Sequence, residues 1–336
     1  MIGITRAIVL AMLIVSPSVC HAGRVEDVLA ARGKLAGQSL AGLDLTGADL
    51  RGADLTKANL EGAVLVGASL VGASLAGASL RGADLREAYL RDARAHGANL
   101  RGARLGSADL TRADLSQANA EGADFTRAVL ESANLARASL KSAFMPGARL
   151  ARARLAGADL TSAVLVGADL SQANLTGAVL KSADLGATRL AESAPGAARL
   201  PGADLTNADL SGANLQNVDL REATLNGAVL AGANLGWANL TWVRARKADF
   251  SRASLAWVRA YGADFTGARF GEATLTRTQL VGANVSGADF RRAALQGASF
   301  EQAELAGADF AGAQLEHALF GAARNLPASV RGASKP

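Results

Sequence analysis

ADLRGADLTKANL, residues 48–60, shows the pattern of five residues that fills most of the chain. A large apolar residue stands at every fifth position, as at Leu50 and Leu55, and Ala stands two places before it. Asp, Asn or Ser usually lies between them, and the other two positions vary, with Gly frequent at the second. From Leu40 to Phe320 this phase of five never slips. We call the large apolar residue the centre of its unit.

The spacing within each unit predicts a very short β-strand. The centre and the residue two places before it are apolar while the residue between is polar, which is the alternation of a half-buried strand. A helix is excluded, because a period of five cannot keep one apolar stripe on a spiral of about 3.6 residues per turn. A strand this short must turn at once, and the Gly-bearing positions supply the turn. Each unit is therefore expected to form one side of a coil.

Phenylalanine centres predict how many sides make one coil. They recur at intervals of twenty residues in two series, which are Phe250, Phe270, Phe290 and Phe310, and Phe300 and Phe320. Rings stacked in successive coils explain this interval, so four sides per coil are favoured over three. The segment 242–245 (WVRA) recurs fifteen residues later as 257–260, and we interpret this as a local duplication rather than a three-sided coil.

Small centres accompany some of the rings. Three alanine centres each precede a phenylalanine centre by five residues, and the pairs are Ala120 with Phe125, Ala245 with Phe250, and Ala260 with Phe265. A ring can use the room that its small neighbour leaves, which indicates one narrow, shared interior. A single unit cannot hold itself together, whereas a continuous stack of units can.

The first residues differ in kind from the repeat. Arg6 is followed by an apolar run over residues 7–15, a Ser-Pro-Ser break and small residues up to Ala22. This pattern predicts a signal peptide over 1–22, because the run is too short to span a bilayer. An uncleaved anchor, or a lipoprotein attached at Cys20, is the alternative. Cleavage would leave a periplasmic or secreted bacterial protein with no transmembrane segment and no cysteine.

The remaining chain divides into two caps and the repeat array. We expect a short N-terminal capping helix over 23–34, the array over 35–320, with roughly fourteen coils, and a C-terminal cap or tail over 321–336. The caps would cover sheet edges that are otherwise open. Two prolines interrupt residues 185–201, yet the phase of five resumes unshifted at Leu200. The sequence predicts a distorted coil there rather than a domain boundary.

Runs such as residues 48–60 resemble the A(D/N)LXX signature of the pentapeptide repeat proteins, and dozens of tandem copies make the resemblance specific. It implies an all-β fold, a right-handed quadrilateral β-helix. The best-known members are acidic, dimeric, cytoplasmic mimics of duplex DNA that bind DNA gyrase. This chain departs from them, because it carries an export signal and has 35 basic against 30 acidic residues, a net charge of +5. A topoisomerase-directed role is therefore the alternative function.

Candidate catalytic groups do not converge in the sequence. His96 and His317 are separated by roughly eleven coils, on the order of 50 Å, and no Gly-rich phosphate loop opens a helix. Several aspartates share one repeat position, one per side, which favours turn hydrogen bonding over a metal site: Asp49, Asp54, Asp109, Asp114, Asp204 and Asp209. We expect no enzymatic activity, no cofactor and no metal.

Two surface features remain after the repeat is explained. The first is a broken basic stripe at multiples of twenty residues, made of Arg81, Arg101, Lys141, Lys181 and Arg221. It is either a solvated face or a dock for an anionic envelope polymer or lipid surface.

The second feature is an aromatic and basic patch near residue 250. We call it the patch, and it consists of Trp237, Trp242, Trp257, Tyr261, Arg244, Arg259 and Arg277. Trp, Tyr and Arg together are typical of the centre of an interface. An external stack that only stabilises the coils, or that self-associates, is the alternative. The sequence thus predicts a non-enzymatic exported scaffold, or a module that binds an unknown protein or glycan partner in the cell envelope. It would be a possible homodimer, and we expect no nucleic-acid partner.

Overall fold

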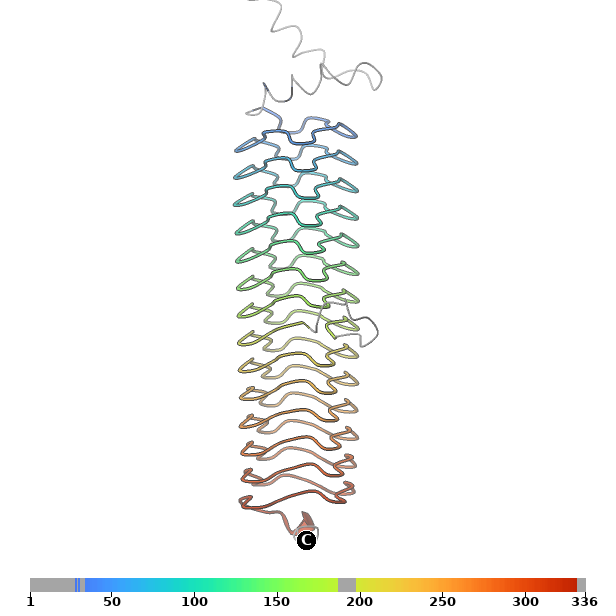
Figure 1. The fold of residues 1–336 in the computed structure, drawn as a ribbon, viewed down its shortest axis with the longest axis vertical. Coiled ribbons are helices and arrows are strands. Elements are labelled where there is room, and N and C mark those ends of the chain that lie inside the picture. Colours follow the sequence, from blue (N-terminus) through green and yellow to red (C-terminus); the bar gives the residue numbers. More distant parts are fainter. Residues whose placement is uncertain (1–27, 29, 31–33, 187–197, 331–336) are drawn as a thin grey trace, which may run out of the picture.

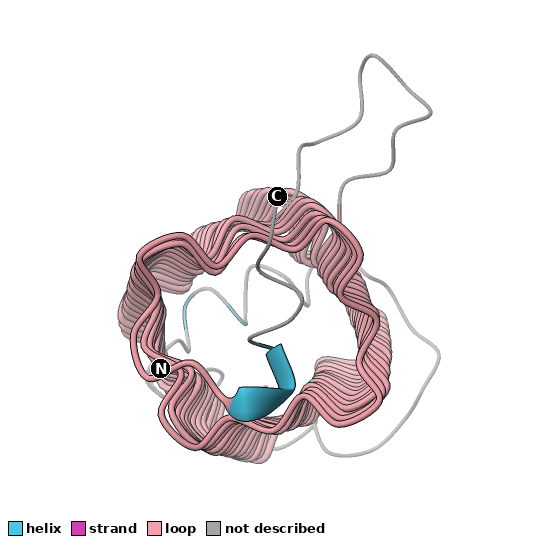
Figure 2. Cartoon of the chain, turned by 90° about the horizontal axis from the view of Figure 1, so that it is seen from below, coloured by secondary structure: helices cyan, strands magenta, loops and turns pink. Residues whose placement is uncertain are grey.

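The computed structural model describes residues 28, 30, 34–186 and 198–330, and in it the chain forms a rod of stacked coils (Figure 1). Seen along the rod, successive coils superpose around one interior (Figure 2). Each unit contributes an isolated parallel bridge rather than a longer strand. The 3-10 helix η1, Ala328–Val330, lies at the C-terminal opening of the rod (Figure 2). The predicted signal peptide, residues 1–22, lies outside the described residues.

The bridges confirm a β-solenoid whose coils have four sides. Outside the four bridges that start at residues 169–184, each bridge residue pairs with the one twenty positions further on, as Ser69 does with Tyr89. The duplicated WVRA segment obeys the same rule, because Arg244 pairs with Asp264 and not with Arg259. A three-sided coil is thereby excluded at this segment. The right-handed sense and the total of roughly fourteen coils stay predictions.

The corners are tight turns. In a typical corner the amide of Ala48 donates to the carbonyl of Leu45 at 3.0 Å, and Gly47 between them has φ of 65°. An i to i+3 hydrogen bond with positive φ at the third residue is the pattern of a type II turn. Glycine is frequent at this position because it reaches positive φ without a steric penalty.

Inward-facing residues form one continuous core. Leu centres and the alanines two places before them are buried along the array. The predicted ring stacks are present: the centroid of Phe270 lies 5.0 Å from that of Phe250 and 4.8 Å from that of Phe290, with nearly parallel planes. Phe265 meets Phe250 edge-on at 5.7 Å. Rings from adjacent sides therefore share the interior, as the small alanine centres indicate.

The stretch of residues 185–201 contains an insertion, so the prediction of a distorted coil there was wrong. Asp169 pairs with Arg199, thirty positions on instead of twenty. The amide of Ala198 donates to the carbonyl of Leu185 at 2.8 Å, the same bond that closes every regular corner. The segment from Leu185 to Ala198 is thus ten residues longer than in a regular corner, and its residues 187–197 lie outside the described residues. Because ten is a multiple of five, the insertion leaves the five-residue phase of the sequence unchanged. Because ten is also half of a twenty-residue coil, it changes the side of the rod on which every later residue lies.

Both ends of the array bury apolar residues from the predicted caps. Arg324 still pairs with Glu304, inside the predicted 321–336 segment, and Val330 in η1 is fully buried against the core. At the other end Val28 is buried in the same core, while most of the predicted capping helix over 23–34 lies outside the described residues. Among the described residues no helix has the length and apolarity needed to span a membrane.

Side chains at the bridge position hydrogen-bond to the following turn. Asp44 accepts both the amide of Thr46 at 3.0 Å and its hydroxyl at 2.6 Å. The aspartates that the sequence assigned to turns all accept the amide two residues on, namely Asp49, Asp54, Asp109, Asp114, Asp204 and Asp209. The prediction of turn hydrogen bonding is confirmed for them.

These turns lead us to expect acid sensitivity. Side-chain hydrogen bonds from the arginines two residues on hold the pKa values of Asp84, Asp219 and Asp289 below the usual 3.8. A carboxyl whose pKa is lower in the folded state stabilises the fold above its unfolded pKa, and this stabilisation is lost as the pH falls through the folded pKa. The thermal midpoint, followed by circular dichroism, should therefore fall below about pH 4.

The same carboxyls should leave the midpoint flat between about pH 5 and pH 8, where they stay ionised in both states. The matched control replaces Asp84, Asp219 and Asp289 by asparagine, which keeps an acceptor oxygen for the turn amide. This variant should show a shallower acid slope than the wild type. A wild-type midpoint that stays constant down to about pH 2 contradicts the prediction.

Candidate functional site

The patch lies on one face of the rod and on the two corners that border it. We name this face the Arg259 face, after the bridged column of Asn239, Arg259 and Gln279. Successive coils bring Trp237, Trp257 and Arg277 together on one bordering corner, the Trp257 corner, where each tryptophan amide donates to the next coil at 3.0 Å.

The other bordering corner is the Trp242 corner. It holds Trp242, whose amide donates to the carbonyl of Tyr261 in the next coil at 2.9 Å. Arg244 lies just past this corner on the next face, which we name the Arg244 face and which contains the bridged pair of Arg244 and Asp264. Six of the seven predicted patch residues therefore lie on the Arg259 face or on its two bordering corners. The seventh, Arg244, lies on the adjacent Arg244 face.

Trp237 and Trp257 are stacked on each other. Their ring centroids are 4.8 Å apart with an angle of 3° between the planes, and the guanidinium of Arg277 lies 4.6 Å above the Trp257 ring. Both residues have φ above 60°, a left-handed conformation that disfavours a bulky side chain by about 1–2 kcal/mol. Aromatic stacking returns about 0.5–1.5 kcal/mol per pair. The faces of these rings are thus largely used within the chain, and this corner offers mainly ring edges.

Trp242 is the tryptophan with the most free surface. It is 63% exposed, against 42% for Trp237 and 39% for Trp257. Its six-membered ring lies across Gly262, where an added Cβ would come within 2.2 Å of Cζ3. The glycine in the next coil therefore creates the space for this ring. Tyr261 beside it is 39% exposed.

Two arginines of the patch form no ion pair in the described chain, although Arg244 interacts electrostatically with Asp204, two coils earlier in its column. Arg244 donates through Nη2 to the hydroxyl of Thr224 at 2.9 Å. Within the described residues, Arg259 has no ion pair and no side-chain hydrogen bond. The carboxylate next to Arg244 in its column, Asp264, is instead bound by Arg246 at 2.6 Å. Partial burial alone would raise the pKa of Asp264, but hydrogen bonds from Thr266 and Arg246 hold it below its usual value.

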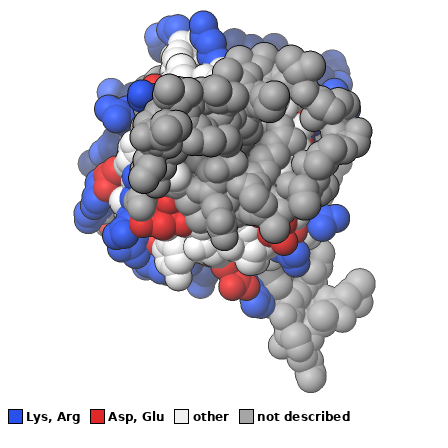
Figure 3. All heavy atoms as spheres, turned by 90° about the horizontal axis from the view of Figure 1, so that it is seen from above, with Lys and Arg blue, Asp and Glu red and all other residues white. Residues whose placement is uncertain are grey.

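The basic stripe is largely neutral locally. Lys141 and Lys181 each lie 3.2 Å from an aspartate of the next coil, and Arg101 lies 3.7 Å from Glu121. Seen from the N-terminal end, Lys and Arg are interspersed with Asp and Glu around the rod (Figure 3). The stripe therefore offers little unpaired charge to an anionic surface.

The prediction that Arg221 belongs to this stripe was wrong. The corner of Lys181 continues at residue 211, because the amide of Ser182 donates to the carbonyl of Ser211. Arg221 lies instead in the column of the Trp242 corner, where the amide of Glu222 donates to the carbonyl of Thr241. The ten-residue insertion rotates all later residues by half a coil, to the diagonally opposite corner.

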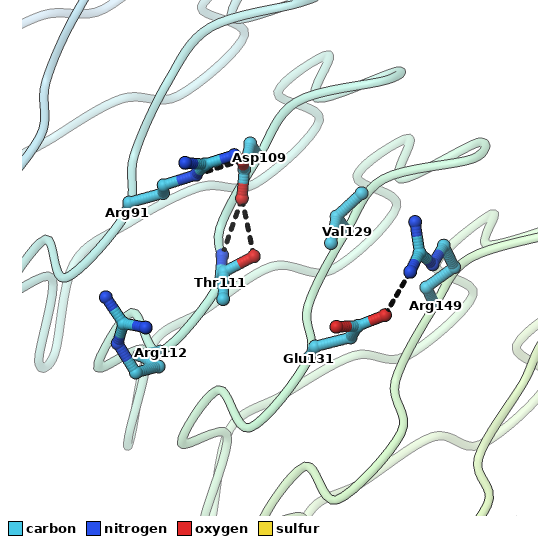
Figure 4. A pocket seen from close by; sticks show the side chains of 7 residues that line it. All are labelled: Arg91, Asp109, Thr111, Arg112, Val129, Glu131 and Arg149. Carbon is cyan, nitrogen blue, oxygen red and sulfur yellow. Dashed lines mark hydrogen bonds and ion pairs between the residues drawn. The ribbon is translucent and has the colours of Figure 1, made fainter.

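A surface hollow that sequence reasoning missed lies further toward the N-terminus (Figure 4). It has a volume of about 330 Å³ and is lined by Arg91, Asp109, Thr111, Arg112, Val129, Glu131 and Arg149. Arg91 pairs with Asp109, Arg149 with Glu131, and Arg112 with Asp92 at 2.7 Å. Its charges therefore satisfy one another. A second hollow is lined by residues between 131 and 172, and neither hollow includes a patch residue.

Sequence reasoning also missed one histidine cluster, because its residues are twenty positions apart and come together only when the chain is coiled. Nδ1 of His96 lies 2.9 Å from Oγ of Ser116, and that hydroxyl donates to Asp114 at 2.6 Å. In a nucleophilic triad the histidine stands between serine and aspartate and takes the serine proton. Here the serine stands in the middle and its proton points to the aspartate, so the cluster does not activate a nucleophile. The described residues contain no group of three potential metal ligands.

Exposed large apolar side chains gather on the same side as the patch. Seven such residues are exposed in the described chain: Tyr89, Phe144, Trp237, Trp242, Trp257, Tyr261 and Leu319. All except Phe144 lie on the Arg259 face or on its two bordering corners, since Tyr89 and Leu319 belong to the same bridged column as Arg259. A contiguous or aligned set of exposed apolar groups is typical of an interaction surface.

A family model described as pentapeptide repeats matches most of the chain. The matched segments are residues 34–67, 68–106, 108–150, 133–172, 153–190, 197–227, 208–244, 233–270, 248–287 and 283–321. No curated protein sequence matches significantly.

Several solved structures resemble the chain. HetL, a pentapeptide repeat protein involved in regulating heterocyst differentiation in the cyanobacterium Nostoc sp. strain PCC 7120, is 28% identical, covers 90% of this chain and 98% of its own, and has a TM-score of 0.22. The plasmid-mediated fluoroquinolone resistance protein QnrB1 is 18% identical over 54% of this chain and 86% of its own, with a TM-score of 0.30. A pentapeptide repeat protein from the Arabidopsis thaliana thylakoid lumen is 24% identical over 40% and 67%, with a TM-score of 0.14.

Proposed function

The chain belongs to the pentapeptide repeat proteins, and we propose that it is a non-enzymatic scaffold that holds a protein partner on its Arg259 face. Pentapeptide repeat proteins are generally structural or binding proteins without catalytic activity. The one described cluster with catalytic residue types, at His96, has its serine proton directed to Asp114. Binding is therefore the role that the surface supports.

One observation carries this proposal: six of the seven exposed large apolar side chains lie on one face and its two corners. Large apolar groups scattered over a rod would need no explanation. Their alignment, with Trp, Tyr and Arg concentrated between residues 237 and 277, has the composition of interface hot spots. The buried rings below, with Phe250 stacked on Phe270, hold this surface on a packed core.

We further propose that the scaffold works in the periplasm or outside the bacterial cell. Support comes from residues 1–22, whose charged start, short apolar run and small residues before Gly23 are typical of a signal peptide. Intact mass measurement of the protein from its native host should give a chain cut after Ala22. A full-length cytoplasmic chain would contradict this location and would favour the topoisomerase-directed alternative.

Affinity capture from native cell envelopes tests the binding function. The bait is the mature chain, and the patch variant replaces Trp237, Trp242 and Trp257 by alanine. The matched control is Phe144→Ala, which removes an aromatic side chain of 48% exposure from a different face. We expect one or more identified proteins to be retained by the wild type and by the control but lost from the patch variant.

Identical captured proteins for all three baits would sink the proposed function. Sedimentation of the wild type and of the patch variant separates partner binding from self-association. If the patch variant changes only the dimerisation of the chain and not the captured proteins, the face is a homodimer contact instead. Circular dichroism melts of all baits verify that the coils remain folded.

A further inference from the structure

We propose that the partner presents an acidic polypeptide segment that docks across the Trp242 corner, between Arg244 and Arg259. This inference rests on the proposed function of the Arg259 face and assigns the chemistry of its partner. It also separates the patch into a contact region at the Trp242 corner and a supporting ladder at the Trp257 corner.

Trp242 provides the anchor of the contact region. It is 63% exposed and lies across Gly262 rather than against another ring. The rings of Trp237 and Trp257 already cover each other, and Arg277 covers the outer face of Trp257. An incoming side chain therefore gains more buried apolar surface on Trp242 than on the ladder.

The charge around Trp242 selects an anionic partner. Arg244 and Arg259 lie on opposite sides of the corner and are both exposed. Neither forms an ion pair among the described residues, although Arg244 interacts electrostatically with Asp204, two coils earlier in its column. The nearby Asp264 is bound by Arg246, and Asp219 is bound by Arg221 at 2.8 Å.

Two carboxylates in the column of the Trp242 corner form no ion pair among the described residues. Glu222 lies one coil before Trp242 and next in sequence to Arg221, and Glu301 lies three coils after residue 241 and accepts a hydrogen bond from Ser299. Against them stand two arginines whose guanidinium groups suit bidentate pairing with carboxylates. The two arginines thus offer positive charge that the chain offsets only in part, and this charge is complementary to an acidic partner.

The shape of the corner favours a polypeptide over a small ligand. Binding sites for small molecules are concave. Both surface hollows lie in the column of this corner, but their lining ends at Gln172 and includes neither Trp242 nor Tyr261. An extended segment can cross the corner at Trp242 and place one carboxylate on each side of it. Trp, Tyr and Arg are also the residues that dominate protein interfaces.

Packing beneath the corner holds the contact residues in place. In the two WVRA units the usual inner pair is reversed, with buried Val243 and Val258 before the small centres Ala245 and Ala260. The centres that follow are Phe250 and Phe265, whose rings meet edge-on at 5.7 Å. A binding site supported by a tightly packed core loses little order on binding.

Binding of fluorescently labelled poly-L-glutamate to the full mature chain tests the inference, with anisotropy as the readout at low and at physiological salt. We expect saturable, salt-sensitive binding to the wild type. Trp242→Ala and the pair Arg244→Gln with Arg259→Gln should each weaken it at least about tenfold. Gly262→Ala should weaken binding too, since the added Cβ displaces the ring of Trp242 while leaving Trp242 in the chain.

Two matched controls distinguish this corner from general charge and general aromaticity. Arg154→Gln removes an exposed arginine from the same bridged column as Arg244, four coils away along that column, and should leave binding unchanged. Trp257→Ala removes a tryptophan of the ladder and should weaken binding by less than about threefold. Thermal melts check that every variant is folded.

Several outcomes would overturn the inference. They are equal binding of polygalacturonate with the same dependence on Trp242, equal binding of uncharged poly-L-glutamine, and equal loss of binding in Arg154→Gln and in the paired arginine variant. If poly-L-glutamate does not bind while envelope capture still depends on the patch, the inference fails and the proposed function stands. If the acidic probe binds as expected but envelope capture is independent of the patch, the proposed function fails instead.

Discussion

Replacing Phe270 by alanine is expected to lower the free energy of unfolding by about 3–5 kcal/mol, more than any surface change in this protein. Phe270 is fully buried, and its ring stacks between Phe250 and Phe290 while Phe265 meets it edge-on at 5.3 Å. Alanine removes the ring and leaves a cavity, because neighbouring coils are tied by backbone bonds and cannot collapse inward.

Since each coil contacts only its neighbours, the damage should be local. Guanidinium unfolding gives the change in free energy, and amide hydrogen exchange shows where it falls. We expect faster exchange in the coils between Phe250 and Phe290 and unchanged exchange near Leu100. Phe144→Ala is the matched control, since Phe144 is an exposed ring in the same fold and should change stability by less than about 0.5 kcal/mol. Equal effects of the two substitutions contradict the role assigned to the ring stack.

A leucine at position 260 should destabilise the protein by about 1–3 kcal/mol, although leucine is the usual centre of the repeat. Ala260 is buried, and the next centre is Phe265. The ring of Phe265 contacts Phe250 and Phe270, which are stacked on another side of the rod. The interior at this level is already filled by rings, so the extra carbons of leucine have no room.

A double substitution separates overpacking from a general intolerance of change. Ala260→Leu with Phe265→Leu restores two ordinary Leu centres, and we expect it to be more stable than Ala260→Leu alone. The coupling free energy from denaturant unfolding of the single and double variants should be of the order of 1 kcal/mol or more in the restoring direction. Additive effects of the two substitutions would show that the centres do not share space.

Much of the candidate site follows from position in the repeat. The second residue of each corner points outward, so the repeat pattern by itself places Trp237, Trp242 and Trp257 on the surface, and all three are exposed. A separation of twenty residues places Trp237 beside Trp257 and Arg277 beyond it, as the stacking confirms. Both columns lie after the insertion, where counting by twenty remains valid.

Other parts of the site needed coordinates, because side-chain direction is decided by neighbours in adjacent coils. The exposure of Trp242 depends on Gly262, which leaves room for its ring. The free charge of Arg259 depends on the absence of a carboxylate within reach among the described residues, while Lys181 in the stripe is paired with Asp209. No repeat pattern states which of two equally basic columns is neutralised.

The five-residue period and the inward pair were determined by the sequence, because an apolar residue at every fifth position can stay buried only if each unit turns at once. The spacing of twenty between phenylalanine centres also indicated the four-sided coil. Which face each residue occupies was decided by the tertiary structure. Ten inserted residues preserve the phase of five but rotate the later chain by half a coil, so Arg221 stands diagonally opposite the stripe it resembles in sequence. Whether a residue is buried depends on its position within the five-residue unit. The face of the rod on which it lies depends on how many residues each preceding coil contains, and only the bridges between coils show that number.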